Sequence, residues 1–339
     1  MPLKLVMASN LPPPPGGPSP EQMAAAAGLE FTRRFCETED ELVELARYCD
    51  GLIVSGRQKV TQSVIEKLKK CRIISQTGIG FDNIDIAAAT EHGIPVTNVP
   101  DYCLEEVSDH AMTLLLALAR KLPVLSREAR DASHWGFAHM FQFWGGIPRL
   151  RGQTLGLVGF GNIPRTLAPK AKGFGLRVIV YDPFISAEVA QKHGVEIVGL
   201  EQLLRESDYV SVHAPVTPKT VHLLSRAQFQ MMKPTAYLIN TARGPLVDEA
   251  ALHEALTSKR IAGAALDVTD PEPPLADNPL LKLDSVIVTA HSAHASDTSY
   301  VELCRRYTEN AIQVLQGKWP RCVLNPQVKA MFEARWGKT

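Results

Sequence analysis

The sequence lacks the charge excess and the long apolar runs that would indicate nucleic-acid or membrane binding. Its 36 basic and 36 acidic residues cancel, whereas proteins that bind nucleic acid or anionic membrane surfaces carry a surplus of positive charge. A membrane span needs roughly 20 apolar residues, and the apolar run at residues 114–119 is far shorter. We therefore expect no nucleic acid and no membrane among its partners.

Cysteine is also scarce. The six cysteines lie at positions 36, 49, 71, 103, 304 and 322, and none forms a C-x-x-C pair. A chain of 339 residues can bury a core without disulfide staples. Residues 1–7 run directly into a proline-rich stretch and lack the apolar core of a secretory signal. These features predict reduced thiols and a cytoplasmic protein.

What the sequence does contain is a repeated alternation of short apolar runs with helical patterns. This alternation predicts an α/β architecture with parallel strands, and the length favours two domains. Residues 131–150 interrupt the pattern with exposed-type aromatics such as Trp135 and Phe137. This segment is either a loop packed on its own domain or an arm that reaches a partner subunit, and the aromatics favour the arm.

Polar residues follow each apolar run of the second half of the chain. Ligands of open α/β sheets bind at the carboxyl ends of the strands, which share one edge. The six predicted strands cover residues 155–158, 178–181, 210–212, 237–239, 264–268 and 286–288. The residues delivered to the edge are, in order, Gly159 and Gly161, Asp182, His213, Arg243, Asp267 with Glu272, and His291. Six such ends in succession indicate one constructed site.

The turn Gly159-Phe160-Gly161 has the chemistry of a nucleotide site. The first glycine permits a sharp turn after the strand, and the second lets backbone amides approach a pyrophosphate at the helix start. Asp182 ends the following strand, where a carboxylate can bind the ribose hydroxyls of NAD and repel the 2′-phosphate of NADP. Pro164 occupies the usual third glycine position, and we expect it to alter the affinity for the cofactor without abolishing binding.

Arg243, Glu272 and His291 suit hydride transfer to a ketone. A guanidinium can bind a carboxylate through two hydrogen bonds, and an imidazole titrates near neutral pH and can donate a proton to a carbonyl oxygen. Glu272 would stabilise the charged imidazole. His291 and His294 could also be a metal pair, but the sequence supplies no third ligand at suitable spacing, so no metal is predicted.

These residues together resemble the D-isomer-specific 2-hydroxyacid dehydrogenase family. The likeness runs from about residue 52 to residue 326. The run at residues 147–152 and the ending at residues 323–326 are similar to the bacterial branch related to carboxyl-terminal-binding-protein corepressors. The passages that are most specific to the family as a whole are residues 77–85, 102–110, 159–182, 232–234, 240–252 and 263–274.

The resemblance implies a Rossmann-type NAD-binding domain, residues 103–294, inserted in a discontinuous flavodoxin-like substrate domain, residues 1–102 and 295–339. It further implies a homodimer, formed through the cofactor domain. The implied catalytic residues are Arg243, Glu272 and His291. The implied cofactor contacts are Gly159, Phe160, Gly161, Asn162, Ile163, Asp182, His213, Ala214, Thr241, Ala242, Arg243, Asp267 and His291.

The substrate residues implied by the resemblance are Gly78, Ile79, Arg243, His291 and His294. Backbone amides near Gly78 and Ile79 would hold the substrate carboxylate together with Arg243. Two departures affect this region: Ala290 replaces a proline before the catalytic histidine, and His294 replaces an aromatic residue that faces the substrate. A histidine at position 294 would make the substrate pocket more polar.

The predicted function is NAD-dependent interconversion of a small 2-oxo acid and its D-2-hydroxy acid, with glyoxylate and hydroxypyruvate as candidates. Two alternatives stay open at this point. One is an NAD(H)-sensing, corepressor-like binding protein with little turnover. The other is a formate- or phosphite-type dehydrogenase, which would use the same site with a different donor.

Overall fold

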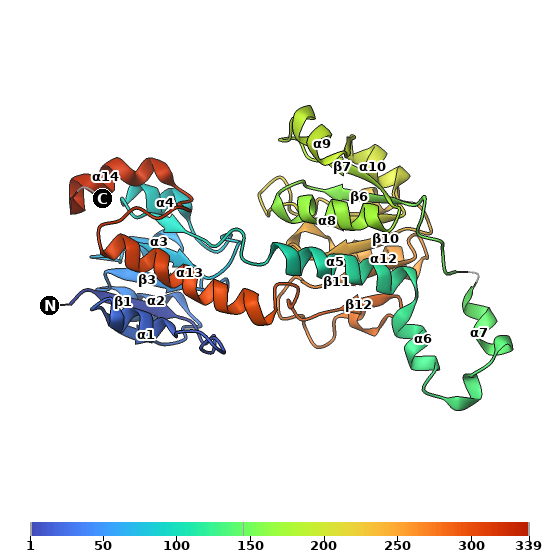
Figure 1. Cartoon of the computed structure of the whole chain (residues 1–339), viewed down its shortest axis with the longest axis horizontal. Coiled ribbons are helices and arrows are strands. Elements are labelled where there is room, and N and C mark those ends of the chain that lie inside the picture. Colours follow the sequence, from blue (N-terminus) through green and yellow to red (C-terminus); the bar gives the residue numbers. More distant parts are fainter. Residues whose placement is uncertain (1, 145, 338–339) are drawn as a thin grey trace. The chain divides into compact units, whose positions relative to one another are not determined.

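A computed structural model describes residues 2–144 and 146–337 (Figure 1). The chain folds into two compact units, Met1–Tyr102 with Ser296–Thr339, and Cys103–Ala295. Each unit is built on one parallel sheet, as the alternating pattern predicts. Within the described residues, no helix combines the length and the apolar character needed to cross a membrane.

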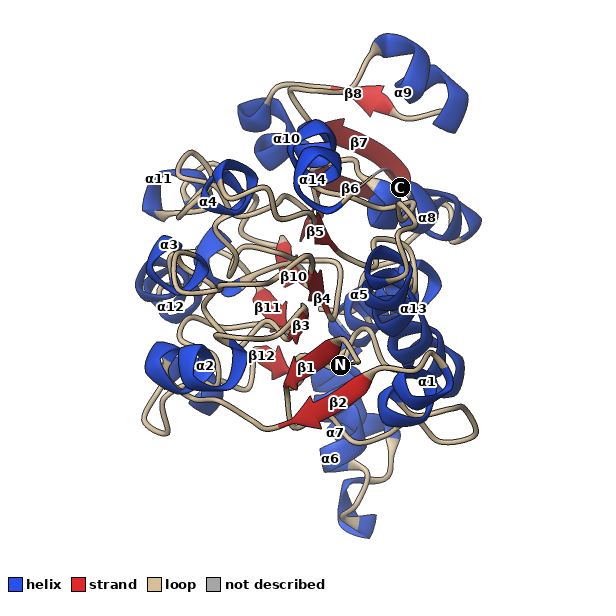
Figure 2. Cartoon of the chain, turned by 90° about the vertical axis from the view of Figure 1, so that its left-hand side faces the viewer, coloured by secondary structure: helices blue, strands red, loops and turns tan. Residues whose placement is uncertain are grey.

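The first unit has a five-stranded sheet in the order β2-β1-β3-β4-β5, which is the flavodoxin-like order. Helices α2, α3 and α4 cover one face, and α1 and α13 cover the other (Figure 2). The strands are β1 Lys4–Ala8, β2 Glu30–Arg33, β3 Gly51–Val54, β4 Ile74–Gln76 and β5 Val96–Thr97. The helices are α1 Pro20–Ala26, α2 Glu39–Ala46, α3 Gln62–Ile65, α4 Ile86–Glu91, α13 Asp297–Leu315, η4 Pro326–Val328 and α14 Lys329–Trp336.

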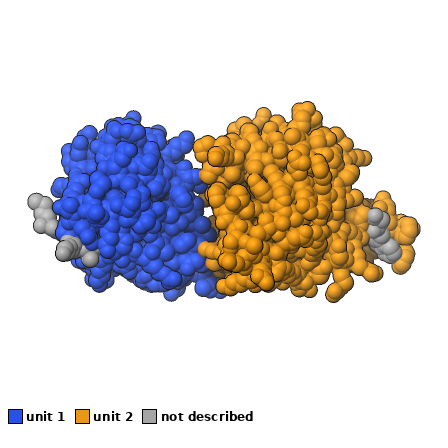
Figure 3. Space-filling model, turned by 90° about the horizontal axis from the view of Figure 1, so that it is seen from above, with its two compact units in different colours: residues 1–102, 296–339 blue, residues 103–295 orange. Residues whose placement is uncertain are grey.

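Alternating side chains explain the two faces of this first sheet. Val6 and Ala8 of β1 pack under α2, while Leu5 and Met7 of the same strand pack under α13. Helix α13 comes from the C-terminal end of the chain, so the first unit is discontinuous in sequence (blue in Figure 3). Helix α13 is bound to the sheet by a hydrogen bond of 2.8 Å, which the Ser75 hydroxyl on β4 donates to the Tyr307 carbonyl.

The second unit has a seven-stranded sheet in the order β12-β11-β10-β9-β6-β7-β8. Numbered from 1 within the unit, the order is 7-6-5-4-1-2-3. This is the 3-2-1-4-5-6 order of a dinucleotide-binding sheet with one more strand, and its switch point lies between β6 and β9. The strands are β6 Thr154–Val158, β7 Arg177–Tyr181, β8 Glu196–Ile197, β9 Tyr209–Val212, β10 Tyr237–Asn240, β11 Gly263–Leu266 and β12 Val286–Val288.

Two helical layers cover this second sheet. One core cluster joins α5, α8 and α9 to the sheet, and the other joins α10, α11 and α12 to its opposite face. The helices are α5 Leu104–Ala119, α6 Leu122–Glu128, η1 Ala132–His134, α7 Phe137–Trp144, α8 Asn162–Gly173, α9 Ala187–His193, α10 Leu200–Glu206, α11 Arg226–Phe229, η2 Gly244–Leu246, α12 Glu249–Thr257 and η3 Pro279–Lys282.

The structure differs from the sequence expectations in three places. The sequence pattern of residues 61–70 predicts a helix over the whole range, but only α3 forms, because the Leu68 N–H turns back to donate to the Ile65 carbonyl. A helix not expected at the end of the proline-rich stretch, α1, starts at a capping box formed by Ser19 and Gln22. Within the predicted arm, residues 131–150, η1 and α7 are helical, and Gly145 lies outside the described residues.

Candidate active site and nucleotide-binding edge

The turn after β6 lies at the switch point of the second sheet. Gly159 has φ +96°, a conformation that side chains of L-residues rarely adopt, and a Cβ at this position would lie 2.9 Å from the carbonyl carbon and oxygen of His213. Because His213 follows β9, the glycine turn touches the end of the neighbouring strand. The switch point is where such sheets bind nucleotides.

The start of α8 is open and suited to an anion. Gly161 precedes the helix. Among the described residues, no side chain caps the first amides of α8, and an added Cβ at Gly161 would meet no atom beyond its chain neighbours within 4 Å. The first N–H groups of a helix have no partners inside the helix, and the helix dipole favours negative charge there. Asn162 and Ile163 form this first turn. Pro164 is buried in the same turn, where the missing N–H removes no helical hydrogen bond.

Asp182 follows β7 and is held against the glycine turn. Its Oδ2 accepts a hydrogen bond of 2.8 Å from the Phe160 N–H, and its Oδ1 accepts one of 2.8 Å from the Phe184 N–H. An ionised carboxylate can accept about four hydrogen bonds, so both oxygens keep acceptor capacity for ribose hydroxyls. The two backbone contacts orient the carboxylate beside the turn and α8.

The ends of β9 and β10 add polar groups along this edge. Nε2 of His213 lies 2.9 Å from the Ser211 hydroxyl, and the two groups share a hydrogen bond. Burial lowers the pKa of His213 to about 4, so its ring is neutral at neutral pH. Thr241 Oγ1 is buried and has no hydrogen-bond partner in the described part of the chain. Ala214 and Ala242 follow the same strands. An open helix start, an oriented carboxylate and an unsatisfied hydroxyl fit a bound dinucleotide.

The loop after β10 holds Arg243 by short-range hydrogen bonds. Asn240 accepts from the Ala242 N–H at 3.0 Å and donates to the Arg243 carbonyl at 2.8 Å. The Arg243 guanidinium Nη1 donates to the Ala242 carbonyl at 2.8 Å. Gly244 comes next, and any Cβ there would overlap the Thr269 backbone. The backbone therefore fixes the base of the arginine side chain at the edge.

His291 and Glu272 form a short contact between ionisable side chains at this edge. Glu272 follows β11 and His291 follows β12, and the two strands are neighbours. Nδ1 of His291 lies 2.6 Å from Oε1 of Glu272. His291 has φ +50°, an uncommon conformation for a residue with a side chain, and such backbone strain clusters at functional sites.

Asp267 holds the loop that carries His291. The resemblance implies that Asp267 contacts the nicotinamide, and that contact stays a prediction. In the structure Asp267 is buried, its Oδ1 accepts from Thr289 Oγ1 at 2.5 Å and from the Ser292 N–H at 2.9 Å, and its Oδ2 accepts from the Ala293 N–H at 3.0 Å. Its main-chain carbonyl also accepts from the His291 N–H at 2.8 Å.

Sequence reasoning missed this positioning role of Asp267 and the part played by His110. His110 on α5 has its Nε2 3.0 Å from Thr289 Oγ1 and 3.6 Å from Asp267 Oδ1. Thr289 thus links the Asp267 carboxylate to His110 on α5. The only sequence signal was the position of His110 at the end of the passage 102–110.

The remaining predicted residues lie as follows. The His294 ring is edge-on to the ring of His291, with centroids 5.9 Å apart, and burial lowers the pKa of His294. Within residues 2–144 and 146–337, no third ligand joins His291 and His294 at metal-binding distance.

Gly78 and Ile79 follow β4 in the first unit. The Gly78 carbonyl accepts a hydrogen bond from the Val99 N–H, and the Ile79 carbonyl accepts one from the Asn98 side-chain amide. Their contact with substrate stays a prediction.

The fold and this edge define a class of protein: a nucleotide-binding, doubly wound domain with a histidine–carboxylate pair, as in nicotinamide-dependent dehydrogenases. Residues 112–293 match the family described as D-isomer specific 2-hydroxyacid dehydrogenase, NAD binding domain. The match covers more than half of the chain. The chain therefore belongs to the D-isomer-specific 2-hydroxyacid dehydrogenase family.

Individual relatives agree. A D-3-phosphoglycerate dehydrogenase of Methanocaldococcus jannaschii is 41% identical over 289 residues, which are 85% of this chain and 54% of the relative. A glyoxylate reductase of Korarchaeum cryptofilum is 40% identical over 288 residues, 85% of this chain and 86% of the relative. The crystal structure of the TT0316 protein from Thermus thermophilus superposes with a TM-score of 0.85, at 34% identity, over 95% of this chain and all of that one.

The comparisons confirm the predicted family, the Rossmann-type fold of its cofactor domain, NAD as cofactor and the class of NAD-dependent oxidoreductase. The chain spans about half the length of the Methanocaldococcus jannaschii relative and most of the length of the Korarchaeum cryptofilum relative. The comparisons do not distinguish branches within the family, so membership of the corepressor-related branch stays a prediction.

Proposed function

We propose that this protein reduces a small 2-oxo acid to its D-2-hydroxy acid with NADH, or catalyses the reverse oxidation with NAD. The observation that carries the proposal is the 2.6 Å contact between His291 Nδ1 and Glu272 Oε1. A binding protein that only senses NAD has no need of an acid–base pair at this edge. Relatives named glyoxylate reductase support the same reaction class.

NAD, when bound, supplies the chemistry of hydride exchange with the substrate carbon. Gly159, Gly161 and the first turn of α8 bind its pyrophosphate, and Asp182 binds its ribose. Thr241 offers an unsatisfied hydroxyl along the same edge. The carboxylate of Asp182 favours NAD over NADP, because a 2′-phosphate would meet negative charge.

His291 supplies the proton for reduction. Its Nδ1 is engaged by Glu272, so Nε2 is the nitrogen that faces the carbonyl oxygen and donates the proton to it. Glu272 stabilises the imidazolium before transfer and fixes the tautomer after it. In the oxidation direction the neutral Nε2 accepts the proton from the substrate hydroxyl.

Arg243 binds the substrate carboxylate and orients the carbonyl. Its guanidinium offers two parallel donors to a carboxylate, and its contact with the Ala242 carbonyl limits how far it can swing. His294, beside His291, favours a small polar substrate such as glyoxylate or hydroxypyruvate.

The test is NADH oxidation, followed by absorbance, with glyoxylate, hydroxypyruvate, pyruvate and 3-phosphohydroxypyruvate. We expect turnover with at least one acid, and a His291→Ala variant should lose about 10²–10⁴-fold of that rate. His253→Ala, on α12 away from this edge, is the matched control and should keep the rate.

Other outcomes would overturn the proposal. NADH binding without turnover of any acid would favour the corepressor-like, NAD-sensing alternative. NAD reduction by formate or phosphite, without turnover of any 2-oxo acid, would favour a formate- or phosphite-type dehydrogenase. Full activity of His291→Ala would reject the assigned proton donor.

We also propose that the protein is a cytoplasmic homodimer. The support for a dimer is the segment of residues 131–150, in which Trp135, Phe137 and Phe141 are 73%, 76% and 65% exposed. Exposed aromatics of this kind are enriched in subunit interfaces. Sedimentation equilibrium tests this proposal. We expect the wild type to be a dimer, and we expect a Trp135→Ser/Phe137→Ser variant to dissociate more readily into monomers.

A further inference from the structure

The segment formed by α6, η1 and α7 has little core of its own. In Figure 1 it projects from the sheet of the second unit. Neither α6 nor η1 contains a buried residue, and none of residues 137–143 is buried. Apolar burial therefore contributes little to holding these three short helical pieces together, and a polar cluster joins them instead.

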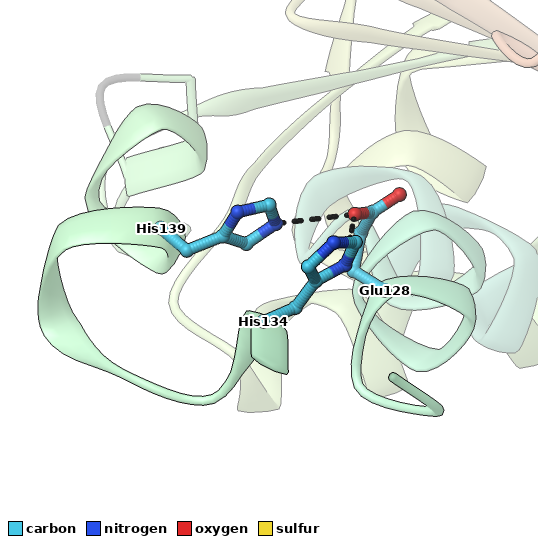
Figure 4. Close-up of side chains that lie close together, drawn as sticks. All are labelled: Glu128, His134 and His139. Carbon is cyan, nitrogen blue, oxygen red and sulfur yellow. Dashed lines mark hydrogen bonds and ion pairs between the residues drawn. The ribbon is translucent and has the colours of Figure 1, made fainter. Parts of the chain in front are cut away.

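That cluster consists of Glu128, His134 and His139, one from each piece. Figure 4 shows the Glu128 carboxylate directed at both imidazoles. Glu128 Oε2 lies 3.1 Å from His134 Nδ1 and 3.2 Å from His139 Nε2, and all three atoms lie within 4.8 Å of one another. We propose that these residues form a Zn²⁺ site, which is separate from the dehydrogenase site and independent of its proposed function.

The distances and the donor atoms fit zinc. With bonds of about 2.0–2.1 Å to nitrogen and oxygen, tetrahedral coordination places neighbouring ligand atoms about 3.3 Å apart. The two measured separations are close to that edge length. Two imidazoles and a carboxylate are a common zinc donor set, and a fourth position is left for water or another ligand.

The surroundings of the cluster favour a cation. His134 Nδ1 is shielded from solvent and, although it lies near Glu128, makes no aligned hydrogen bond. Asp131 Oδ2 lies 3.8 Å from Nε2 of His134, so a second carboxylate adds negative charge beside the cluster.

Gln142 offers the fourth ligand. Its side-chain amide lies 3.3 Å from His139 Nε2, again the edge length of a zinc tetrahedron. Rotating the amide by half a turn exchanges its nitrogen and oxygen and presents Oε1 to the ion. A Gln142→Ala variant then replaces this ligand with water, and we expect zinc to bind about tenfold more weakly.

The metal-free arrangement differs from the bound one in a defined way. The rings of His134 and His139 stack with centroids 4.0 Å apart and planes 13° apart. Nitrogen lone pairs lie in the ring planes, so one imidazole has to turn about its Cβ–Cγ bond to share an ion with the other. Zinc binding then ties the ends of α6 and η1 to the start of α7, and stabilises a segment that lacks a core.

The direct test uses the full chain freed of metal with a chelator and then titrated with ZnCl₂ in a calorimeter. We expect one equivalent to bind with a Kd of about 10 µM or tighter. CoCl₂ should give the intense visible absorption of tetrahedral coordination. The variants His134→Ala, His139→Ala and Glu128→Gln should each weaken binding at least 30-fold.

Two controls localise the metal. His253→Ala should bind zinc like the wild type, and so should His291→Ala/His294→Ala, which removes the histidine pair of the dehydrogenase edge. Binding weaker than 100 µM in the wild type would overturn the proposal. Unchanged binding in His134→Ala/His139→Ala would do so as well. Circular dichroism of each variant shows whether a loss of binding reflects unfolding.

Discussion

Glu272 Oε1 and His291 Nδ1 are 2.6 Å apart, although 19 residues separate them in sequence and they follow different strands. The strands β11 and β12 are parallel neighbours, so their carboxyl ends bring the two side chains to one point. The loop carrying His291 is further held by Asp267. The proposed acid–base chemistry of the protein depends on this convergence.

Removing the carboxylate of Glu272 should slow the reaction. In Glu272→Gln, His291 Nδ1 loses the carboxylate oxygen that lies 2.6 Å away and orients the imidazole. We expect kcat to fall about 10–100-fold, the range for carboxylates that orient a metal-bound histidine. The measurement is kcat and KM for the wild type, Glu272→Gln and the exposed-site control Glu188→Gln. An unchanged kcat in Glu272→Gln would contradict this role.

A methyl group at Gly159 should damage both fold and cofactor binding. The added Cβ would lie 2.9 Å from the His213 backbone at a φ of +96°, and such strain costs about 1–3 kcal/mol. Gly161→Ala is the matched variant, because its Cβ meets nothing. We expect Gly161→Ala to keep the melting temperature while weakening NADH binding, and Gly159→Ala to lower both. Equal melting temperatures would show that the turn relaxes.

Asp182 should determine the preference for NAD. In Asp182→Ser the negative charge at the ribose site is gone, and loss of charge-assisted hydrogen bonds costs about 1.5–3 kcal/mol. NADH should therefore bind at least tenfold more weakly, while NADPH should bind more tightly than to the wild type. Fluorescence titration with both cofactors measures this change, with Glu188→Ser as the control. A wild type that prefers NADPH would refute the assignment.

His213 should make the stability of the protein depend on pH. Its pKa in the folded protein is about 4, below the usual 6.5 of an unfolded chain, so the unfolded state binds the proton more readily. Stability from this residue is present above pH 6.5 and is lost as the pH falls towards 4, by up to about 3 kcal/mol. Urea unfolding at pH 7, 5.5 and 4.5 should show a shallower decline for His213→Gln. Parallel declines would assign the effect to other groups.

Local patterns in the sequence were sufficient to predict which polar residues reach the edge. Each strand of the second sheet is a short apolar run, and the polar residue after it is visible in the sequence, as for Asp182, Arg243 and His291. The parallel arrangement follows from the alternation of strands and helices. Short helices were harder to predict. The helix α1 depends on the capping box of Ser19 and Gln22, and α3 ends where Leu68 turns back into the core.

The sequence alone determined which groups reach the carboxyl edge of the cofactor domain, because strand period and chain order decide where each strand ends. Only the tertiary structure decided what those groups touch. The spacing of Glu128, His134 and His139 does not match one face of a helix, so turns between three helical pieces bring them together. Asp267 likewise acquired its positioning role from the path of a distant loop, whose N–H groups require a buried acceptor.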